Sequence, residues 1–83
     1  MPVKLEIRLF AGLKCNNPSL PCYKQGDFTL EVPEGTTVQE LHKILELESP
    51  LPLITLVNGL SSAVDRMLAD NDRVGIFPPV GGG

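Results

Sequence analysis

The stretch FTLEVPEGTTVQELHKIL, residues 28–45, decides the fold class. Its first five residues alternate between apolar and polar, which predicts a half-buried strand at residues 28–32. A turn with proline and glycine follows at residues 33–35. The apolar residues then recur at helical spacing, so the stretch predicts a strand that leads directly into a helix.

The predicted helix has a start signal and an apolar face. Thr37 suits the N-cap position and Glu40 stands three residues later, which makes a capping box. Four apolar residues then form a stripe at helical spacing: Val38, Leu41, Ile44 and Leu45. We expect Pro50 and Pro52 to end this helix. His42 lies one step off the stripe, so it is expected on the surface or at the boundary between core and surface.

Both ends of the chain carry further strands. Residues 3–9 alternate apolar and polar, and Phe10 continues the polar side, so its ring should emerge on the exposed face. The last predicted strand is residues 73–77, with Phe77 on its outward side. Two prolines, Pro78 and Pro79, cannot donate hydrogen bonds to a sheet and end that strand.

The middle of the chain is less regular. Residues 53–57 are apolar and rich in strand formers, and Asn58-Gly59 after them is a turn signal. Residues 61–72 are mixed, with Met67 and Leu68 expected as buried anchors. Their last three residues are expected to form a tight turn.

This order of elements predicts an α+β fold. One helix must cover one face of a mixed sheet of four to five strands, because neither can bury its apolar side alone. The arrangement is a β-grasp, in which the first and last strands lie side by side. Residues 1–79 form one domain, with a long connection at residues 11–27, and residues 80–83 form a flexible glycine tail.

Composition excludes several classes of function. The 83 residues carry a net charge of −3 and no basic patch, so nucleic acid is not an expected partner. No apolar run could span a membrane and no signal peptide is recognisable, so the expected location is the cytoplasm. The two cysteines, Cys15 and Cys22, are too few for a disulfide scaffold or a zinc site, and their role stays open. With one histidine and no phosphate-binding loop, the chain is not expected to be an enzyme by itself.

The C-terminal residues could carry chemistry. Pro78 and Pro79 favour a stiff, extended exit from the sheet. Residues 81–83 are all glycine, so they can thread a narrow channel and deliver the carboxylate of Gly83 into another protein's active site. Glycines alone would equally fit a frayed end, but the stiff segment before them favours a working tail.

A docking surface is expected beside this tail. Phe10 and Phe77 fall on the outward side of neighbouring strands, where two exposed aromatic rings would form an apolar patch. Leu60 is expected to join them. Scattered surface apolar residues are common, so the position beside the tail exit is what favours docking.

These features together resemble a known family. The segment VGIFPPV, residues 74–80, followed by Gly82-Gly83, looks like the end of the small subunit of molybdopterin synthase (MoaD). Residues 8–11 resemble the first strand of that ubiquitin-like family. Residues 57–59 and 68–72 match its middle in the same order. The resemblance covers nearly the whole chain.

The resemblance implies a sulfur carrier. A separate activating enzyme of the MoeB/ThiF type would use ATP to adenylate Gly83, and a sulfur donor protein would convert the adenylate to a thiocarboxylate. A MoaE-like large subunit would then use that sulfur, while the chain itself binds no cofactor or metal. The residues implied at the partner interfaces are Phe10, Leu60, Phe77, Pro78, Pro79 and Val80, followed by the tail residues Gly81 and Gly82.

Other assignments stay open. Thiamine sulfur carriers (ThiS) and archaeal protein modifiers share the fold and the diglycine, and a modifier would be joined through Gly83 to lysines of its targets. A plain β-grasp interaction module with an inert tail is a further alternative. The length of the connection at residues 11–27 and the extra Gly81 depart from the family pattern and leave the exact partner open. The sequence also leaves open the oligomeric state.

Overall fold

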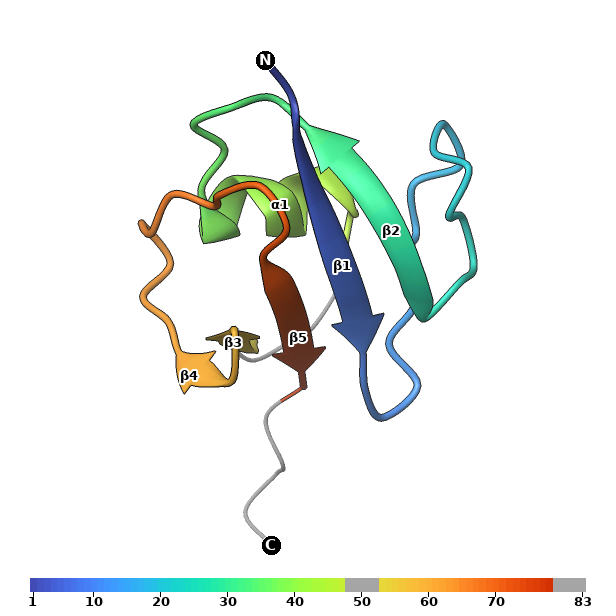
Figure 1. Ribbon diagram of the computed structural model, residues 1–83. Coiled ribbons are helices and arrows are strands. Elements are labelled where there is room, and N and C mark those ends of the chain that lie inside the picture. Colours follow the sequence, from blue (N-terminus) through green and yellow to red (C-terminus); the bar gives the residue numbers. More distant parts are fainter. Residues whose placement is uncertain (48–52, 79–83) are drawn as a thin grey trace, which may run out of the picture.

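The computed structural model describes residues 1–47 and 53–78, which form one five-stranded sheet with a helix across one face (Figure 1). The strands lie in the order β2-β1-β5-β3-β4. The elements are β1 (Val3–Leu9), β2 (Asp27–Val32), α1 (Val38–Ile44), β3 (Ile54–Val57), β4 (Leu60–Ser61) and β5 (Arg73–Phe77). The predicted β-grasp architecture is confirmed.

The pairing of the strands follows from their alternating sequences. β1 is buried at every second residue and pairs antiparallel with β2. β1 also pairs in parallel with β5, so the first and last strands lie side by side in the sheet. The inward residues of these strands pack on the helix, and the largest fully buried side chains include Leu5, Ile7, Leu41, Leu45 and Ile76.

The start of α1 is the predicted one. Thr37 is the N-cap, and its hydroxyl accepts a hydrogen bond from the Glu40 backbone N–H at 3.2 Å. The Glu40 carboxylate in turn accepts from the Thr37 backbone N–H at 3.1 Å, which completes the capping box. His42 is half-buried, as expected for a boundary residue.

The end of α1 differs from the prediction. The helix stops at Ile44, well before Pro50 and Pro52, which both lie outside the described residues. The chain turns out of the helix at Glu46, which has a φ of 53° and whose N–H donates to the Lys43 carbonyl at 3.1 Å. The long β1–β2 connection caps this end, since Asn17 Nδ2 donates to the Ile44 carbonyl at 2.7 Å and the Asn16 N–H to the Leu45 carbonyl at 2.9 Å. These donors satisfy carbonyl groups that a helix end leaves free.

The predicted turn at Asn58-Gly59 joins β3 to β4. Both residues have positive φ angles, 54° and 83°, which suits a tight hairpin. The Asn58 side chain also ties this hairpin to the start of β5: its Nδ2 donates to the buried Asp72 carboxylate at 2.9 Å, and its Oδ1 accepts from the Arg73 N–H at 2.9 Å. Asn71 adopts φ 68° in the predicted tight turn before β5.

The expectation for Met67 is wrong, whereas that for Leu68 is confirmed. Met67 is 67% exposed and Leu68 only 3% exposed. The segment is extended here, with Met67 bridged to Thr37 and the Leu68 N–H donating to the Thr36 carbonyl. Neighbouring side chains on an extended chain point to opposite sides, so only one of the two can reach the core.

Candidate partner-docking face

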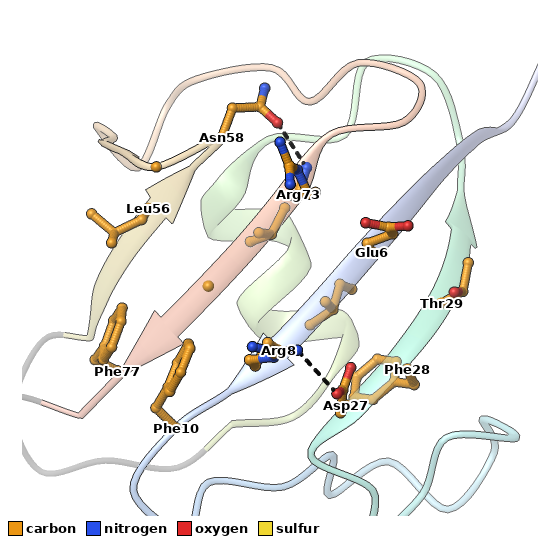
Figure 2. A pocket seen from close by; sticks show the side chains of 14 residues that line it. Glu6, Arg8, Phe10, Asp27, Phe28, Thr29, Leu56, Asn58, Arg73 and Phe77 are labelled. Atoms are coloured by element: carbon orange, nitrogen blue, oxygen red, sulfur yellow. Dashed lines mark hydrogen bonds and ion pairs between the residues drawn. The ribbon is translucent and has the colours of Figure 1, made fainter.

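Two aromatic rings lie on the sheet face opposite the helix. Phe77 ends β5, and Phe10 directly follows β1, where its backbone N–H donates to the Ile76 carbonyl at 3.0 Å. The two rings are stacked, with centroids 4.2 Å apart and planes inclined by 4°. Figure 2 shows both rings standing side by side at the ends of the two strands. Both predicted positions on the outer face are therefore confirmed.

Gly75 makes room for this pair. A Cβ atom added to Gly75 would lie 3.2 Å from Cε2 of Phe10 and 3.7 Å from Cε1 of Phe77. The first distance is tighter than an ordinary carbon–carbon contact, so a side chain here would push on the Phe10 ring. Glycine within a strand often marks such a close approach, and Gly75 is the one residue in the sequence that signals the approach of the two rings.

Strand β3 extends the apolar area. Ile54 is the register partner of Phe77, and Leu56 is the partner of Gly75. Residues directly opposite each other on neighbouring strands share a face, so both side chains lie on the outer side. Ile54 is 48% exposed. The sequence predicts neither position, because residues 53–57 are apolar almost throughout and do not show which side faces outward.

Leu60 does not lie on this face. It is the register partner of Val57, which is fully buried on the helix side of the sheet. The parity of β4 therefore places Leu60 on the opposite side from the two aromatic rings, at the sheet edge, where it is 69% exposed. The expectation that it joins Phe10 and Phe77 is wrong, because the tight turn at Asn58-Gly59 fixes the register of the short β4 strand.

Charged side chains cover the rest of the outer face. Arg8 lies 3.5 Å from the Asp27 carboxylate, with both side chains largely exposed, and Glu6 is the register partner of Arg73. A shallow groove of about 890 Å³ runs between these groups and the aromatic pair (Figure 2). An exposed ion pair contributes little to stability. The face therefore combines an apolar end with a region of mixed charge.

The tail begins at the apolar end of this face. Pro78, which follows Phe77 directly, is half-buried. The remaining predicted site residues, Pro79, Val80 and residues 81–83, lie outside the described residues. The parallel pairing of β1 and β5 sets the geometry, because it brings Phe10 to the same end of the sheet at which β5 ends.

Comparison with known proteins decides the family. The model of the ThiS family matches residues 14–83, most of the chain. The chain belongs to the ThiS family. No curated protein matches the sequence.

Solved structures of ThiS-like proteins match over nearly the whole chain. The Haloferax volcanii HVO 2177 protein is 25% identical, covers 99% of this chain and 88% of its own, and has a TM-score of 0.71. A protein described as a candidate molybdopterin converting factor, subunit 1, from Pyrococcus furiosus is 28% identical, with 94% and 99% covered and a TM-score of 0.62. Small archaeal modifier protein 1 of H. volcanii is 21% identical, with 94% and 99% covered and a TM-score of 0.67, which shows the shared fold.

Membership of the ThiS family confirms the resemblance drawn from the sequence. The fold is the ubiquitin-like β-grasp, and the family consists of small sulfur carriers or modifiers that are generally not catalysts themselves. Across residues 1–47 and 53–78, no group of three or more His, Cys, Asp or Glu side chains gathers in a way that could hold a metal ion. No helix in this part of the chain is long and apolar enough to cross a membrane.

Proposed function

We propose that this ThiS-family chain is a sulfur carrier that acts as the small subunit of molybdopterin synthase. The observation that carries the proposal is the stacked Phe10–Phe77 pair on the outer face, directly beside the point where the glycine tail leaves β5. Similarity to the P. furiosus protein described as a candidate molybdopterin converting factor supports this assignment. A ThiS-type carrier for thiazole synthesis is the second candidate, because the matching family model is that of ThiS.

The chemistry would occur at the carboxylate of Gly83. A carboxylate is a poor electrophile, so the activating enzyme first transfers AMP from ATP to it and releases pyrophosphate. The resulting mixed anhydride has a good leaving group. Sulfur from a donor protein, in the form of a persulfide, then displaces AMP and forms an acyl disulfide. A thiol reduces this acyl disulfide, which leaves a thiocarboxylate on Gly83 and a disulfide between the thiol and the donor cysteine. The sulfur of Gly83 is the nucleophile passed on to the cofactor precursor.

The docking face would hold the partners while the tail reaches their active sites. A flat, partly exposed aromatic pair offers contact area at little cost in side-chain entropy. The charged groups around it, Arg8 and Arg73 with Glu6 and Asp27, would fix the orientation of the partner. The tail residues Gly81 and Gly82 would pass through a narrow channel, for which the absence of side chains is a requirement. Pro78, Pro79 and Val80 would lie at its mouth. The predicted contact of Leu60 with a partner is separate from this face, because a partner on the face would have to reach around the β4 edge of the sheet to touch Leu60.

The test is activation of the purified chain. It is incubated with a MoeB/ThiF-like enzyme, ATP, a persulfide donor and a thiol reductant, and intact mass spectrometry follows the replacement of one oxygen by sulfur. The chain lacking Gly82-Gly83 is the matched control and should not react, although we expect it to melt at nearly the same temperature as the full chain. An unchanged mass of the full chain, with an enzyme that is active on its own carrier, would refute the proposal.

The fate of the thiocarboxylate separates the assignments. Addition of a MoaE-like large subunit and the pterin precursor should consume the thiocarboxylate and return the original mass. Consumption only by a thiazole synthase would assign the chain to thiamine synthesis. Adducts on lysines of other proteins, detected after incubation with cell extract and ATP, would instead identify a modifier.

A further inference from the structure

The two cysteines of the long β1–β2 connection lie side by side in the core. Cys15 is 0% exposed and Cys22 3% exposed, and both are free thiols. Their Sγ atoms are 3.3 Å apart, and the Cys22 thiol donates to Cys15. A disulfide bond is about 2.05 Å long, so closing it requires the two sulfurs to approach by roughly 1.3 Å. Small rotations of the two side chains can supply such a movement.

The backbone of the connection holds the two cysteines in this position. The Lys24 N–H donates to the Cys15 carbonyl at 2.8 Å, and the Cys15 N–H donates to the Gln25 carbonyl at 3.0 Å. The Gln25 N–H also donates to the Cys22 carbonyl at 2.8 Å, so Cys22 is linked to the same frame. The contact between the sulfurs is therefore fixed by the folded connection.

We propose that Cys15 and Cys22 form a dithiol–disulfide site that fastens the β1–β2 connection when the chain meets a low-molecular-weight disulfide. The thiolate of one cysteine attacks the reagent, forms a mixed disulfide and releases one thiol. The second cysteine then attacks the mixed disulfide, closes the internal bond and releases the second thiol. The two cysteines are oxidised and the reagent is reduced to two thiols.

Burial makes this site slow and selective. Desolvation, together with the hydrogen bond to Cys15, raises the pKa of the Cys22 thiol to about 12. A protonated thiol is a poor nucleophile, and neither sulfur is accessible to a reagent in the folded chain, so the first step requires a local opening of the connection. Once a mixed disulfide forms, the neighbouring sulfur is in position to displace the reagent.

The disulfide is expected to act on stability and not on docking. The connection caps α1 through Asn16 and Asn17, so fastening it also secures the end of the helix. Both cysteines belong to the buried core, whereas Phe10 and Phe77 lie on the outer face. The oxidised chain should therefore be activated at Gly83 as well as the reduced chain.

The experiment prepares the disulfide in urea with glutathione disulfide, refolds the chain and compares it with the reduced form. The disulfide closes a loop of eight residues, residues 15–22, for which the chain-entropy relation predicts a melting temperature higher by roughly 10–20 °C. Dithiothreitol should reverse the shift. Cys22→Ala, treated in the same way, should show no such shift, because it can only form a mixed disulfide.

A second measurement does not depend on that variant. The equilibrium between the dithiol and glutathione disulfide is measured for the wild-type chain in native buffer and in urea, and approached from both directions. The internal disulfide, recognised by the loss of two hydrogens in the intact mass, should be favoured at least about tenfold more in the folded chain. An equal or lower preference in the folded chain would overturn the proposal. Mixed disulfides or disulfide-linked dimers as the main folded products would overturn it as well.

Discussion

Replacing Phe77 by alanine separates the outer face of the sheet from its core. The ring is half-buried and stacks on Phe10. A stacked aromatic pair contributes about 0.5–1.5 kcal/mol beyond the area it buries. With the partial burial of the ring, Phe77→Ala is expected to lower the free energy of unfolding by about 1–2 kcal/mol.

The matched comparison is the preceding residue of the same strand. Ile76 is fully buried against the helix, so Ile76→Ala should lower the free energy of unfolding by about 2–5 kcal/mol. Val74, which is also buried, should behave in the same way when shortened to alanine. Partner affinity should show the opposite order. If Phe77 is a hot spot, its truncation costs about 2 kcal/mol of binding, or roughly a thirtyfold weaker affinity.

The assays are urea or thermal unfolding and calorimetric titration with the activating enzyme or the large synthase subunit. For a domain of this size 1 kcal/mol corresponds to a shift of roughly 4–8 °C in melting temperature, so the two classes of variant are distinguishable. Phe10→Ala and the double variant complete a thermodynamic cycle, in which the coupling should equal the energy of the stack. The reasoning is refuted if Phe77→Ala destabilises the fold as much as Ile76→Ala while the folded variant keeps its full affinity for partners.

Two further predictions concern stability. Asp72→Ala should lower the free energy of unfolding by about 1–3 kcal/mol, because Asn58 Nδ2 and the Ala69 N–H lose the carboxylate that accepts their bonds at 2.9 and 2.8 Å. Urea unfolding measures this loss, with Asp65→Ala at an exposed position as the control, and equal effects of the two substitutions would contradict the role of Asp72. Burial lowers the pKa of His42, whose Nε2 lies 2.8 Å from Thr55 Oγ1, so the unfolded chain binds the proton more tightly. The stability linked to His42 should be complete above its ordinary pKa of about 6.5 and be lost as the pH falls below it. His42→Gln should flatten that part of the pH profile in thermal melts, and an unchanged profile would exclude His42 as its cause.

Local patterns in the sequence were sufficient for most of the fold. The capping box at Thr37 and Glu40, the alternation in β1 and the turn at Asn58-Gly59 each depend on neighbouring residues, and the structure has all three. The outward positions of Phe10 and Phe77 follow from the same alternation. Their stacking also requires β1 and β5 to pair in parallel, and the β-grasp order of strands provides this pairing.

The features that were missed depend on contacts between distant parts of the chain. α1 ends in a left-handed turn at Glu46, where the sequence has no glycine to announce it, and the caps from Asn16 and Asn17 come from the distant β1–β2 connection. The side on which Leu60 lies depends on a two-residue strand whose register comes from the preceding turn. The approach of Cys15 and Cys22 likewise arises from backbone bonds across the connection, which composition and spacing do not reveal.

The outer face is difficult to explain by folding alone. Positions 10 and 77 lie on the side of the sheet away from the helix. The residues of β1 that face this side, Lys4, Glu6 and Arg8, are exposed and charged. Polar residues at both positions would satisfy the same alternation and leave the core unchanged. Two aromatic rings are found there instead. Gly75 of the neighbouring strand β5 lies against them, and a side chain at this position would disturb Phe10. A glycine inside a strand weakens the strand, so this arrangement sacrifices local stability for a flat apolar surface. The proposed docking of partners at the start of the tail would account for both features.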